Sequence, residues 1–263
     1  MKHLPYCIMC ADAVPQGELP RGIDGRPVQV LADGELAVAF SAVSDSLCSP
    51  NLLRLAAYAE AIRALHELST VLPLQYGCFL PSREHLVNLL RARRCELLAL
   101  LERVRGCHEM CIRILPDVHG GPAEPAESQV SLAREGRGAA YLTGRRRYYW
   151  QVDRSRRQAA TLSQMWQARL EGLYLECRTE FGVAPAVRRA GSSGPTLCIY
   201  FLVPRQREGD FRARFRTLMR RESARALLSG PWPPYNFVTA QISSMPNRET
   251  PREPRQGKAP APG

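Results

Sequence analysis

Two pairs of cysteines are spaced as metal ligands can be. Cys7 and Cys10 form a C-x-x-C motif, and Cys107 and Cys111 enclose His108. Thiolate and imidazole groups at such spacings can hold zinc. The C-x-x-C, however, lies in an apolar segment typical of a β-strand, where positions three apart face opposite sides. The sequence therefore predicts free thiols packed as small apolar side chains, and no bound metal.

Other groups that could do chemistry lack a catalytic spacing. The remaining histidines are His3, His66, His85 and His119, and we expect solvated or capping imidazoles. The segment at 191–194 (GSSG) lacks the G-x-S-x-G spacing of a nucleophile elbow, and neither a Walker-A nor a G-x-G-x-x-G motif is present. We therefore predict no catalytic residue, no cofactor and no small-molecule substrate. A triad assembled from distant residues stays open as the alternative.

A basic cluster stands next to aromatic residues. Arg145, Arg146 and Arg147 precede the triplet at 148–150 (YYW), a combination that could stack on bases and contact phosphates. On a helix, however, six consecutive residues point in all directions. The favoured interpretation is that some of the aromatic rings pack on the core while the arginines stay solvated or pair with acids.

The least ordinary segment is the proline-rich stretch at 230–238 (GPWPPYNFV), which we call the strap. Its prolines remove backbone donors, so we predict an extended or turned segment and neither a helix nor a central strand. Its aromatic rings either fill the core or present a pre-ordered surface to a protein partner, and different rings can do each. A polyproline repeat of three would place Trp232 and Tyr235 on one side and Phe237 on another. The candidate partner-binding residues are Trp232, Pro233, Pro234, Tyr235, Phe237, Arg145, Arg146 and Arg147.

Charge and hydropathy limit the classes of protein. The net charge is +11, and it is uneven, because residues 1–133 carry 12 basic and 15 acidic side chains whereas 134–157 carry 8 and 2. A basic second half favours nucleic acid or acidic protein surfaces, although the near absence of lysine is also what a GC-rich coding sequence produces. No apolar run is long enough to span a bilayer, and the first residues lack the apolar region of a secretory signal. With nine scattered cysteines, these features favour a cytoplasmic protein with reduced thiols.

The elements that must position these residues read as α+β. Apolar runs predict strands at 6–11, 28–31, 35–43, 71–74 and 107–115, with a hairpin turn at Asp33-Gly34. Helices are predicted after Ser49-Pro50, with an inward stripe that begins at Leu52 and Leu55, and after Ser82. Residues 1–116 should form a ferredoxin-like α/β sandwich with both helices on one face of the sheet.

The remainder reads as a linker, a second unit and a tail. Residues 117–138 are rich in Gly, Pro, Ala, Ser and Glu and predict a linker. Residues 139–242 predict a small α+β unit that has a long helix or two over 139–181, strands at 184–190, 196–203 and 225–228, and a helix at 210–222. The proline-rich segment 243–263 predicts a disordered tail.

The strap and three other segments together resemble the gas vesicle protein family L/F, GvpF/GvpL. The strap with its two preceding residues (LSGPWPPYNFV) is similar to the family's C-terminal signature, and YFLVPR at 200–205 to its Y-L-V-P strand end. The segment TVLPLQYG at 70–77 resembles T-V-L-P-x-R-F-G, and the stretch 22–43 resembles the amino-terminal hairpin. Gln75 departs from the family pattern by replacing an arginine, and Cys7 differs from the usual opening strand.

This resemblance implies a function that composition and spacing do not reach. It implies a two-domain, non-enzymatic accessory protein of gas vesicle assembly, in the cytoplasm and associated with the vesicle. The implied partners are the hydrophobic shell protein and other accessory proteins during nucleation, with shell-protein aggregation limited by the contact. The alternative from another class is a basic nucleic-acid-binding regulatory protein, although nucleic acid is the less favoured partner.

Overall fold

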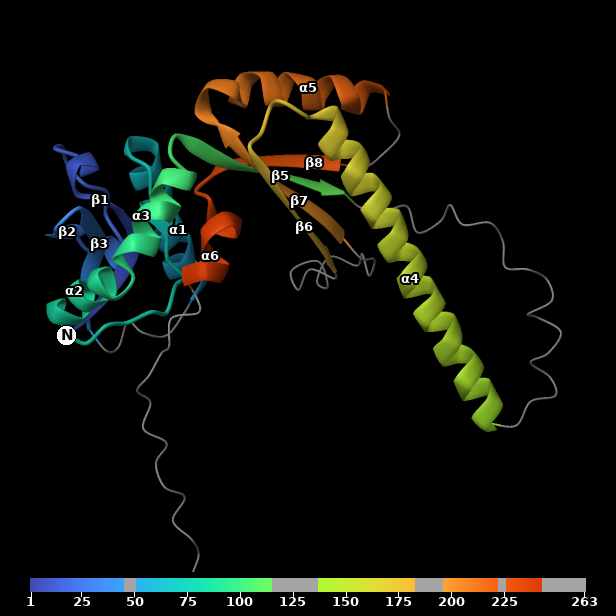
Figure 1. Cartoon of the computed structure of the whole chain (residues 1–263). Coiled ribbons are helices and arrows are strands. Elements are labelled where there is room, and N and C mark those ends of the chain that lie inside the picture. Colours follow the sequence, from blue (N-terminus) through green and yellow to red (C-terminus); the bar gives the residue numbers. More distant parts are fainter. Residues whose placement is uncertain (45–50, 115–136, 183–195, 222–225, 243–263) are drawn as a thin grey trace, which may run out of the picture.

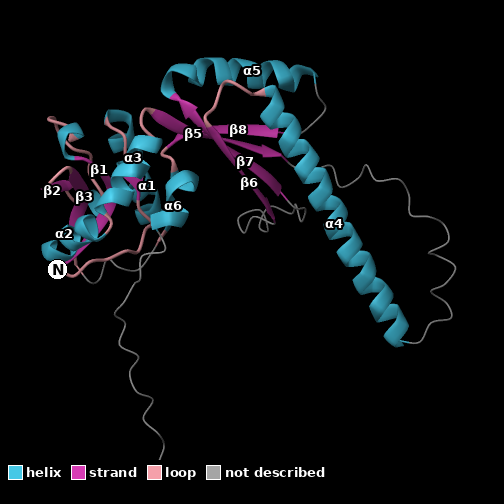
Figure 2. Ribbon diagram, in the orientation of Figure 1, coloured by secondary structure: helices cyan, strands magenta, loops and turns pink. Residues whose placement is uncertain are grey.

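The protein is built on two separate antiparallel β-sheets (Figure 1). The computed structural model describes residues 1–44, 51–114, 137–182, 196–221 and 226–242. Within these ranges each sheet has four strands, in the order β2-β3-β1-β4 in the first and β6-β7-β5-β8 in the second. Figure 2 shows that each group of strands has helices packed beside it. The predicted α+β class is therefore confirmed.

The first sheet contains β1 (Lys2–Cys10), β2 (Gln29–Asp33), β3 (Leu36–Val43) and β4 (Leu72–Pro73). Strands β2 and β3 form the predicted hairpin, in which Asp33 pairs with Leu36. Gly34 in its turn has φ 62°, a conformation that glycine adopts at little cost. The hairpin is therefore confirmed, but its two-residue turn is Gly34-Glu35, one residue beyond the predicted Asp33-Gly34.

Three helices cover both faces of the first sheet. They are α1 (Leu52–Leu68), α2 (Arg83–Ala92) and α3 (Arg94–Arg103). Alternate β3 residues belong to two apolar cores, because Val38 packs with α2 and α3 whereas Ala39 packs with α1. The expectation that the helices share one face is therefore wrong. The side chain of Asn51 accepts the capping bond of α1 from the Arg54 amide at 2.8 Å, while the expected cap at 49–50 lies outside the described residues.

The second sheet contains β5 (Cys107–Ile114), β6 (Glu176–Gly182), β7 (Thr196–Pro204) and β8 (Ala226–Trp232). The sequence placed the strand at 107–115 in the first sheet, and this is wrong, because β5 pairs with β7 and β8. The apolar pattern of β5 predicts a strand but does not indicate which sheet the strand joins. A boundary after residue 116 groups β5 with the first sheet in the sequence, although the strand pairs within the second sheet.

Two helices cover one face of the second sheet. These are α4 (Arg137–Arg169) and α5 (Glu208–Arg221), whose Trp166 and Phe211 are fully buried against the sheet. Helix α4 ends at Arg169, so the helix expected over 139–181 is too long. Cys177 and Phe181 lie in β6, and their spacing of four imitated a helical stripe. The strand expected at 184–190 and the tail at 243–263 lie outside the described residues.

The last helix, α6 (Tyr235–Ile242), returns to the first sheet. Its Phe237 and Val238 are buried in the same apolar core as Ile8 of β1 and Leu90 of α2, together with Leu202 of β7. Side chains from both sheets thus share one core. Whether residues 1–116 and 139–242 behave as separate domains stays a prediction, and most of the expected linker, 117–136, lies outside the described part of the chain.

Candidate functional site

The strap begins as the end of an edge strand. Strand β8 is at the edge of its sheet and has β5 as its single neighbouring strand in the described part of the chain. An edge strand tolerates Pro231, which has no backbone N–H, because no strand on its outer side needs that donor. Gly230 has φ 115°, and a Cβ there would stand 2.8 Å from the carbonyl oxygen of Glu109. A side chain at this position would therefore meet both backbone strain and a steric clash. The β5–β8 register shifts between Glu109 and Cys111, so that Trp232 pairs with Glu109.

The strap continues into a helix, which the sequence did not predict. Pro233 and Pro234 are buried, and α6 starts at the next residue, Tyr235. Prolines before or within a first helical turn remove amides that have no helical partner there, so they permit a helix that follows them. The expectation of no helix in this segment is therefore wrong for residues 235–238.

A buried carboxylate holds the start of α6. Glu109 of β5 is 3% exposed and accepts hydrogen bonds from the backbone amide of Asn236 at 2.7 Å and from its side-chain amide at 2.6 Å. Burial raises the pKa of Glu109 to about 7, although the bonds from Asn236 act in the opposite direction. Arg178 of β6 donates to the Asn236 carbonyl oxygen at 2.6 Å. The start of α6 is thus fixed to the second sheet by two strands.

The rings of the strap divide into a buried one and an exposed one. Phe237 is 0% exposed, and the guanidinium carbon of Arg178 lies 5.5 Å from its ring centroid. Trp232 is 43% exposed, and Tyr235 is half-buried. Trp232 and Tyr235 line one shallow cleft whereas Phe237 points into the core. This is the division of sides that the spacing predicted, although a helix start rather than a polyproline repeat produces it.

Helix α1 supplies the other wall of that cleft. The cleft has a volume of about 110 Å³ and is lined by Ala56, Ala59, Glu60, Arg63, Trp232, Pro233 and Tyr235. Beyond it, the exposed face of α1 carries Leu52, 85% exposed, and Leu53, 82% exposed, while Leu55 is 41% exposed. We call the set of exposed apolar residues the α1–strap surface, and its members are Leu52, Leu53, Leu55, Ala56, Ala59 and Trp232.

This surface corrects the predicted orientation of α1. The predicted stripe of α1 is correct for Ile62 and Leu65, which are buried together with Tyr58, Ala61 and His66. It is wrong for its first four members, Leu52, Leu55, Ala56 and Ala59, which are exposed. Both sets have helical spacing, so periodicity alone could not separate them. The aromatic Tyr58 was the signal for the buried face, because a large ring in a row of alanines and leucines has most to gain from burial.

The basic and aromatic segment of α4 lies away from the strap. Arg145 and Arg146 are exposed, and the side chain of Arg147 lies outside the described part. Tyr149 is 52% and Trp150 61% exposed, so these two rings do not pack on the core, while the side chain of Tyr148 lies outside the described part. Each has an arginine near its face instead, with Arg145 5.8 Å from the Tyr149 centroid. Figure 1 shows this half of α4 projecting beyond the second sheet on the side away from α6.

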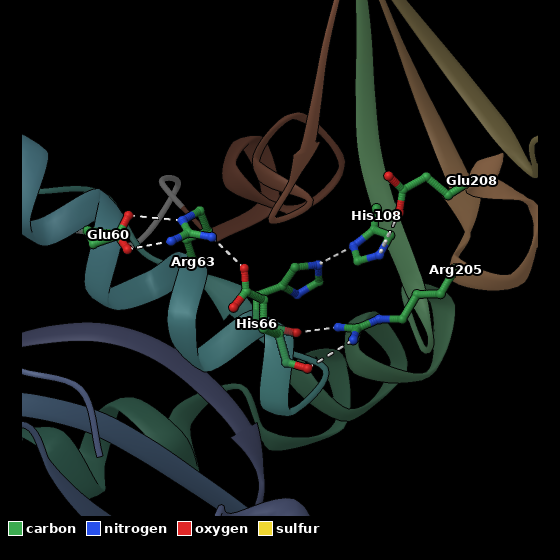
Figure 3. Close-up of polar contacts among 7 residues, drawn as sticks. Glu60, Arg63, His66, His108, Arg205 and Glu208 are labelled. Atoms are coloured by element: carbon green, nitrogen blue, oxygen red, sulfur yellow. Dashed lines mark hydrogen bonds and ion pairs between the residues drawn. The ribbon is translucent and has the colours of Figure 1, made fainter. Parts of the chain in front are cut away.

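Two histidines meet where α1 joins the second sheet (Figure 3). The Nε2 atom of His66 lies 3.2 Å from Nδ1 of His108, and Arg205 donates to the carbonyl oxygens of His66 and, at 3.1 Å, of Glu67. Burial and the nearby Arg205 lower the pKa of His66 to about 3. The expectation of solvated or capping imidazoles is wrong for these two histidines, since both imidazoles are buried. The two neutral imidazole rings thus form a structural contact between α1 and β5.

The described ranges hold neither a cluster of metal ligands nor a membrane-spanning helix. No three His, Cys, Asp or Glu side chains of residues 1–44, 51–114, 137–182, 196–221 and 226–242 gather as a metal site requires. Cys7 packs in the core under α1, whereas Cys10 packs against the core under α2 and α3, so the C-x-x-C thiols face opposite sides. None of the helices in those ranges is long and apolar enough to cross a bilayer. Gln75 is exposed and takes no part in a buried polar pair.

Comparison with known proteins gives a family match and a fold match. The family model described as "Gas vesicle synthesis protein GvpL/GvpF" matches residues 4–239. The fold is similar to a crystal structure of GvpF from Microcystis aeruginosa, with a TM-score of 0.73, 17% identity, and coverage of 90% of this chain and 99% of that one. It is also similar to GvpF from Anabaena sp. PCC7120, with a TM-score of 0.69, 17% identity, and coverage of 90% and 96%. No curated protein gave a significant match.

Proposed function

Because the chain belongs to the GvpL/GvpF family of gas vesicle synthesis proteins, we propose that it is an accessory protein of gas vesicle assembly that binds the hydrophobic shell protein. The contact is made during nucleation, in the cytoplasm at the forming vesicle, together with other accessory proteins. The role is binding, without catalysis, cofactor or small-molecule substrate. Membership of the family carries the link to gas vesicles, and the structure suggests which surface makes the contact.

The observation that carries this proposal is the exposure of the α1–strap surface. Leu52 and Leu53 are more than four-fifths exposed, and the partly exposed Trp232 stands beside the same helix. Contiguous exposed apolar residues mark interaction sites on soluble proteins. Trp is also the residue type most enriched among those that dominate binding energy. A hydrophobic shell subunit is a partner of matching chemistry for this surface.

A hydrophobic shell subunit needs a binding partner that covers it before assembly. A subunit that builds a wall from hydrophobic strands exposes unpaired edges and apolar side chains before assembly, and such segments aggregate. A surface that covers them reversibly limits aggregation and delivers the subunit to the growing wall. Because Pro233 and Pro234 precede a helix fixed by Glu109, the strap has little conformational entropy left to lose on binding.

Capture from cells tests the proposal. Tagged protein is purified from cells that carry the full vesicle gene cluster, with and without the shell gene, and bound proteins are identified by mass spectrometry. Shell protein should be recovered with the wild-type chain and with Leu175→Ser, which changes a leucine that is 62% exposed outside the α1–strap surface. Recovery should fall with Trp232→Ala. Equal recovery of shell protein with Trp232→Ala and wild type would contradict the assigned surface.

Nucleic-acid binding is the second candidate, and α4 is what favours it. Arg145, Arg146 and Arg154 stand with the exposed rings of Tyr149 and Trp150 on the projecting half of this helix. Such a combination can contact phosphates and stack on bases. Binding of RNA that weakens steeply with salt, and that weakens further in Arg146→Ala, would support this candidate. Weak binding that does not change in Arg146→Ala would exclude it.

A further inference from the structure

Two cysteines from different strands come together on the second sheet. Cys111 of β5 lies opposite Tyr200 of β7, and Cys198 of β7 lies opposite Arg113 of β5. Opposite residues of an antiparallel pair share a face, so Cys111 and Cys198 are diagonal neighbours on one face. The neighbouring residues of both strands, among them Ile112 and Ile199, point to the other face, which packs under α4 and α5.

The two thiols influence each other and differ in acidity. The side chains of Cys111 and Arg113 interact with Cys198, while the Tyr200 hydroxyl donates to the Glu180 carboxylate at 3.1 Å. The hydrogen bond from Cys111 is the main cause that lowers the pKa of Cys198, against the effect of burial. The same bond, together with burial, raises the pKa of Cys111. Cys198 is therefore the more acidic thiol of the pair and Cys111 the less acidic one.

Cys198 and Cys111 are shielded from solvent but lie among exposed side chains. Cys198 is 8% and Cys111 6% exposed. The two register neighbours of Cys198, Arg113 on β5 and Glu180 on β6, are themselves exposed. A thiolate held by a guanidinium next to a second thiol is the arrangement found where cysteines are oxidised reversibly. Large alkylating reagents should reach this sulfur more slowly than a small oxidant.

We propose that Cys198 and Cys111 form a peroxide-reactive dithiol site that closes to a reversible cross-strand disulfide. The Cys198 thiolate attacks one oxygen of a hydroperoxide, so that an S–O bond forms and the O–O bond breaks. The departing hydroxide or alkoxide takes a proton from solvent, and Cys198 becomes a sulfenic acid. Cys111 then loses its proton and attacks the Cys198 sulfur, the S–S bond forms, and the hydroxyl group leaves as water. Two thiols are oxidised, and one peroxide is reduced.

The register also explains why this disulfide should be easily reduced. Diagonal neighbours in a regular ladder have Cα atoms about 7–8 Å apart, which is beyond the separation that a disulfide bridges without movement of the backbone. Closure must therefore draw β5 and β7 together slightly. A disulfide formed under such a constraint is more readily reduced than an unstrained one. The site goes beyond the proposed shell-protein contact and does not depend on it.

Peptide mapping of the full chain tests the site. The protein is treated with limiting hydrogen peroxide, blocked with an alkylating reagent and digested with trypsin without reduction. Cleavage after arginine places Cys111 in the peptide 106–113 and Cys198 in 190–205. These two peptides should appear linked, and glutathione should restore them. Because Cys107 shares the first peptide, fragment ions and a Cys107→Ala control must assign the bond to Cys111.

Variants separate the two steps. Cys111→Ser should stop at the sulfenic acid of Cys198, which a 1,3-dione probe traps, whereas Cys198→Ser should give neither the linked peptides nor the trapped product. The exposed Cys95 on α3 serves as the measure of simple accessibility, and Cys95→Ser should leave the linkage unchanged. Oxidation of Cys95 while Cys198 stays reduced in the wild-type chain would overturn the proposal, as would a bond from Cys111 to Cys107. Mapping the wild-type chain decides the question even where a variant does not fold.

Discussion

Glu109 on β5 binds both amide groups of Asn236 at the start of α6, at 2.7 Å to the backbone nitrogen and 2.6 Å to the side-chain nitrogen. The next residue, Phe237, lies in the core shared with the first sheet. One carboxylate thus fixes the point at which the strap passes from the second sheet to the first. The orientation of Trp232 beside α1 depends on this fixed point, because only two prolines and Tyr235 separate the ring from Asn236.

The stability of the protein should depend on pH through Glu109. Burial raises the pKa of this carboxyl group to about 7 from an ordinary value of 4.5, so the folded state binds a proton that the unfolded state has released. Its stabilising contribution is complete below pH 4.5 and is lost as the pH rises through about 7. Glu109→Gln removes this titration. The Tm of the wild type minus that of Glu109→Gln should therefore decrease from pH 5 to pH 8.

The comparison of these two proteins cancels the other titrating groups. His66, whose pKa is lowered to about 3, is present in both and acts equally on both transitions. Glu84→Gln, on the exposed side of α2, is the control for the same replacement away from β5. A Tm difference that increases between pH 5 and pH 8 would show that Glu109 is a charged capping group whose hydrogen bonds outweigh its burial.

Trp232→Ala and Phe237→Ala should have different consequences. Phe237 is fully buried, so its truncation leaves a cavity and should cost about 3–5 kcal/mol of unfolding free energy. Trp232 is 43% exposed, so Trp232→Ala should stay folded with a much smaller loss. Denaturant titration of both variants measures the difference. Equal destabilisation would mean that Trp232 is a core residue rather than part of a surface.

A methyl group at residue 230 should disturb the strap directly. Gly230→Ala must place a Cβ 2.8 Å from the Glu109 carbonyl oxygen at a φ of 115°, and we expect a loss of about 2 kcal/mol or more. Gly209→Ala in α5 is the matched control, since a Cβ there meets nothing within 4 Å. It should be neutral or stabilise by up to about 1 kcal/mol, because alanine is the better helix former. Similar Tm values for the two variants would contradict this account of Gly230.

Local signals in the sequence were sufficient for several elements. The Asp33-Gly34 signal located the β2–β3 hairpin to within one residue, and apolar runs located β5 and β7. What they could not show is which distant partner each run meets. Strand β5 belongs to the second sheet because its pairing with β7 was decided by tertiary contacts, which a single apolar run does not encode. In β6, the spacing of Cys177 and Phe181 imitated a helical stripe, because spacing alone does not show that this segment pairs with β7.

The strap could be recognised in the sequence, but the residues packed around it could not. Proline chemistry and aromatic spacing identified Trp232 and Phe237, and even their opposite orientation. The contribution of α1 was missed, because Leu52 and Leu55 have the spacing of a core stripe and only the fold shows that they are exposed. Cys111 was paired in the sequence with Cys107, whereas strand register brings it to Cys198. Glu109 was overlooked, since one carboxylate in an apolar strand gives no motif.

The shared core predicts how the two halves respond to proteolysis. The composition of 117–138 predicts cleavage there. Since Leu202, Phe237 and Val238 pack with residues of the first sheet, the two fragments should remain bound in size-exclusion chromatography and separate only in denaturant. Mass spectrometry locates the cut. Fragments that separate under native conditions would show that the halves are independent domains, and early cleavage inside α1 or α2 would contradict the division itself.

The most direct test of the central claim is the affinity of the purified protein for the shell protein, held in solution as a fusion to a soluble carrier. The account predicts that Trp232→Ala and the double variant Leu52→Ser/Leu55→Ser each weaken binding by about 30-fold, equivalent to roughly 2 kcal/mol, while their Tm values stay near that of the wild type. Leu175→Ser, which changes a leucine 62% exposed outside the surface, should bind within about twofold of the wild type. Folded α1–strap variants that bind the shell protein as tightly as the wild type would contradict the claim that this surface is the shell-protein contact.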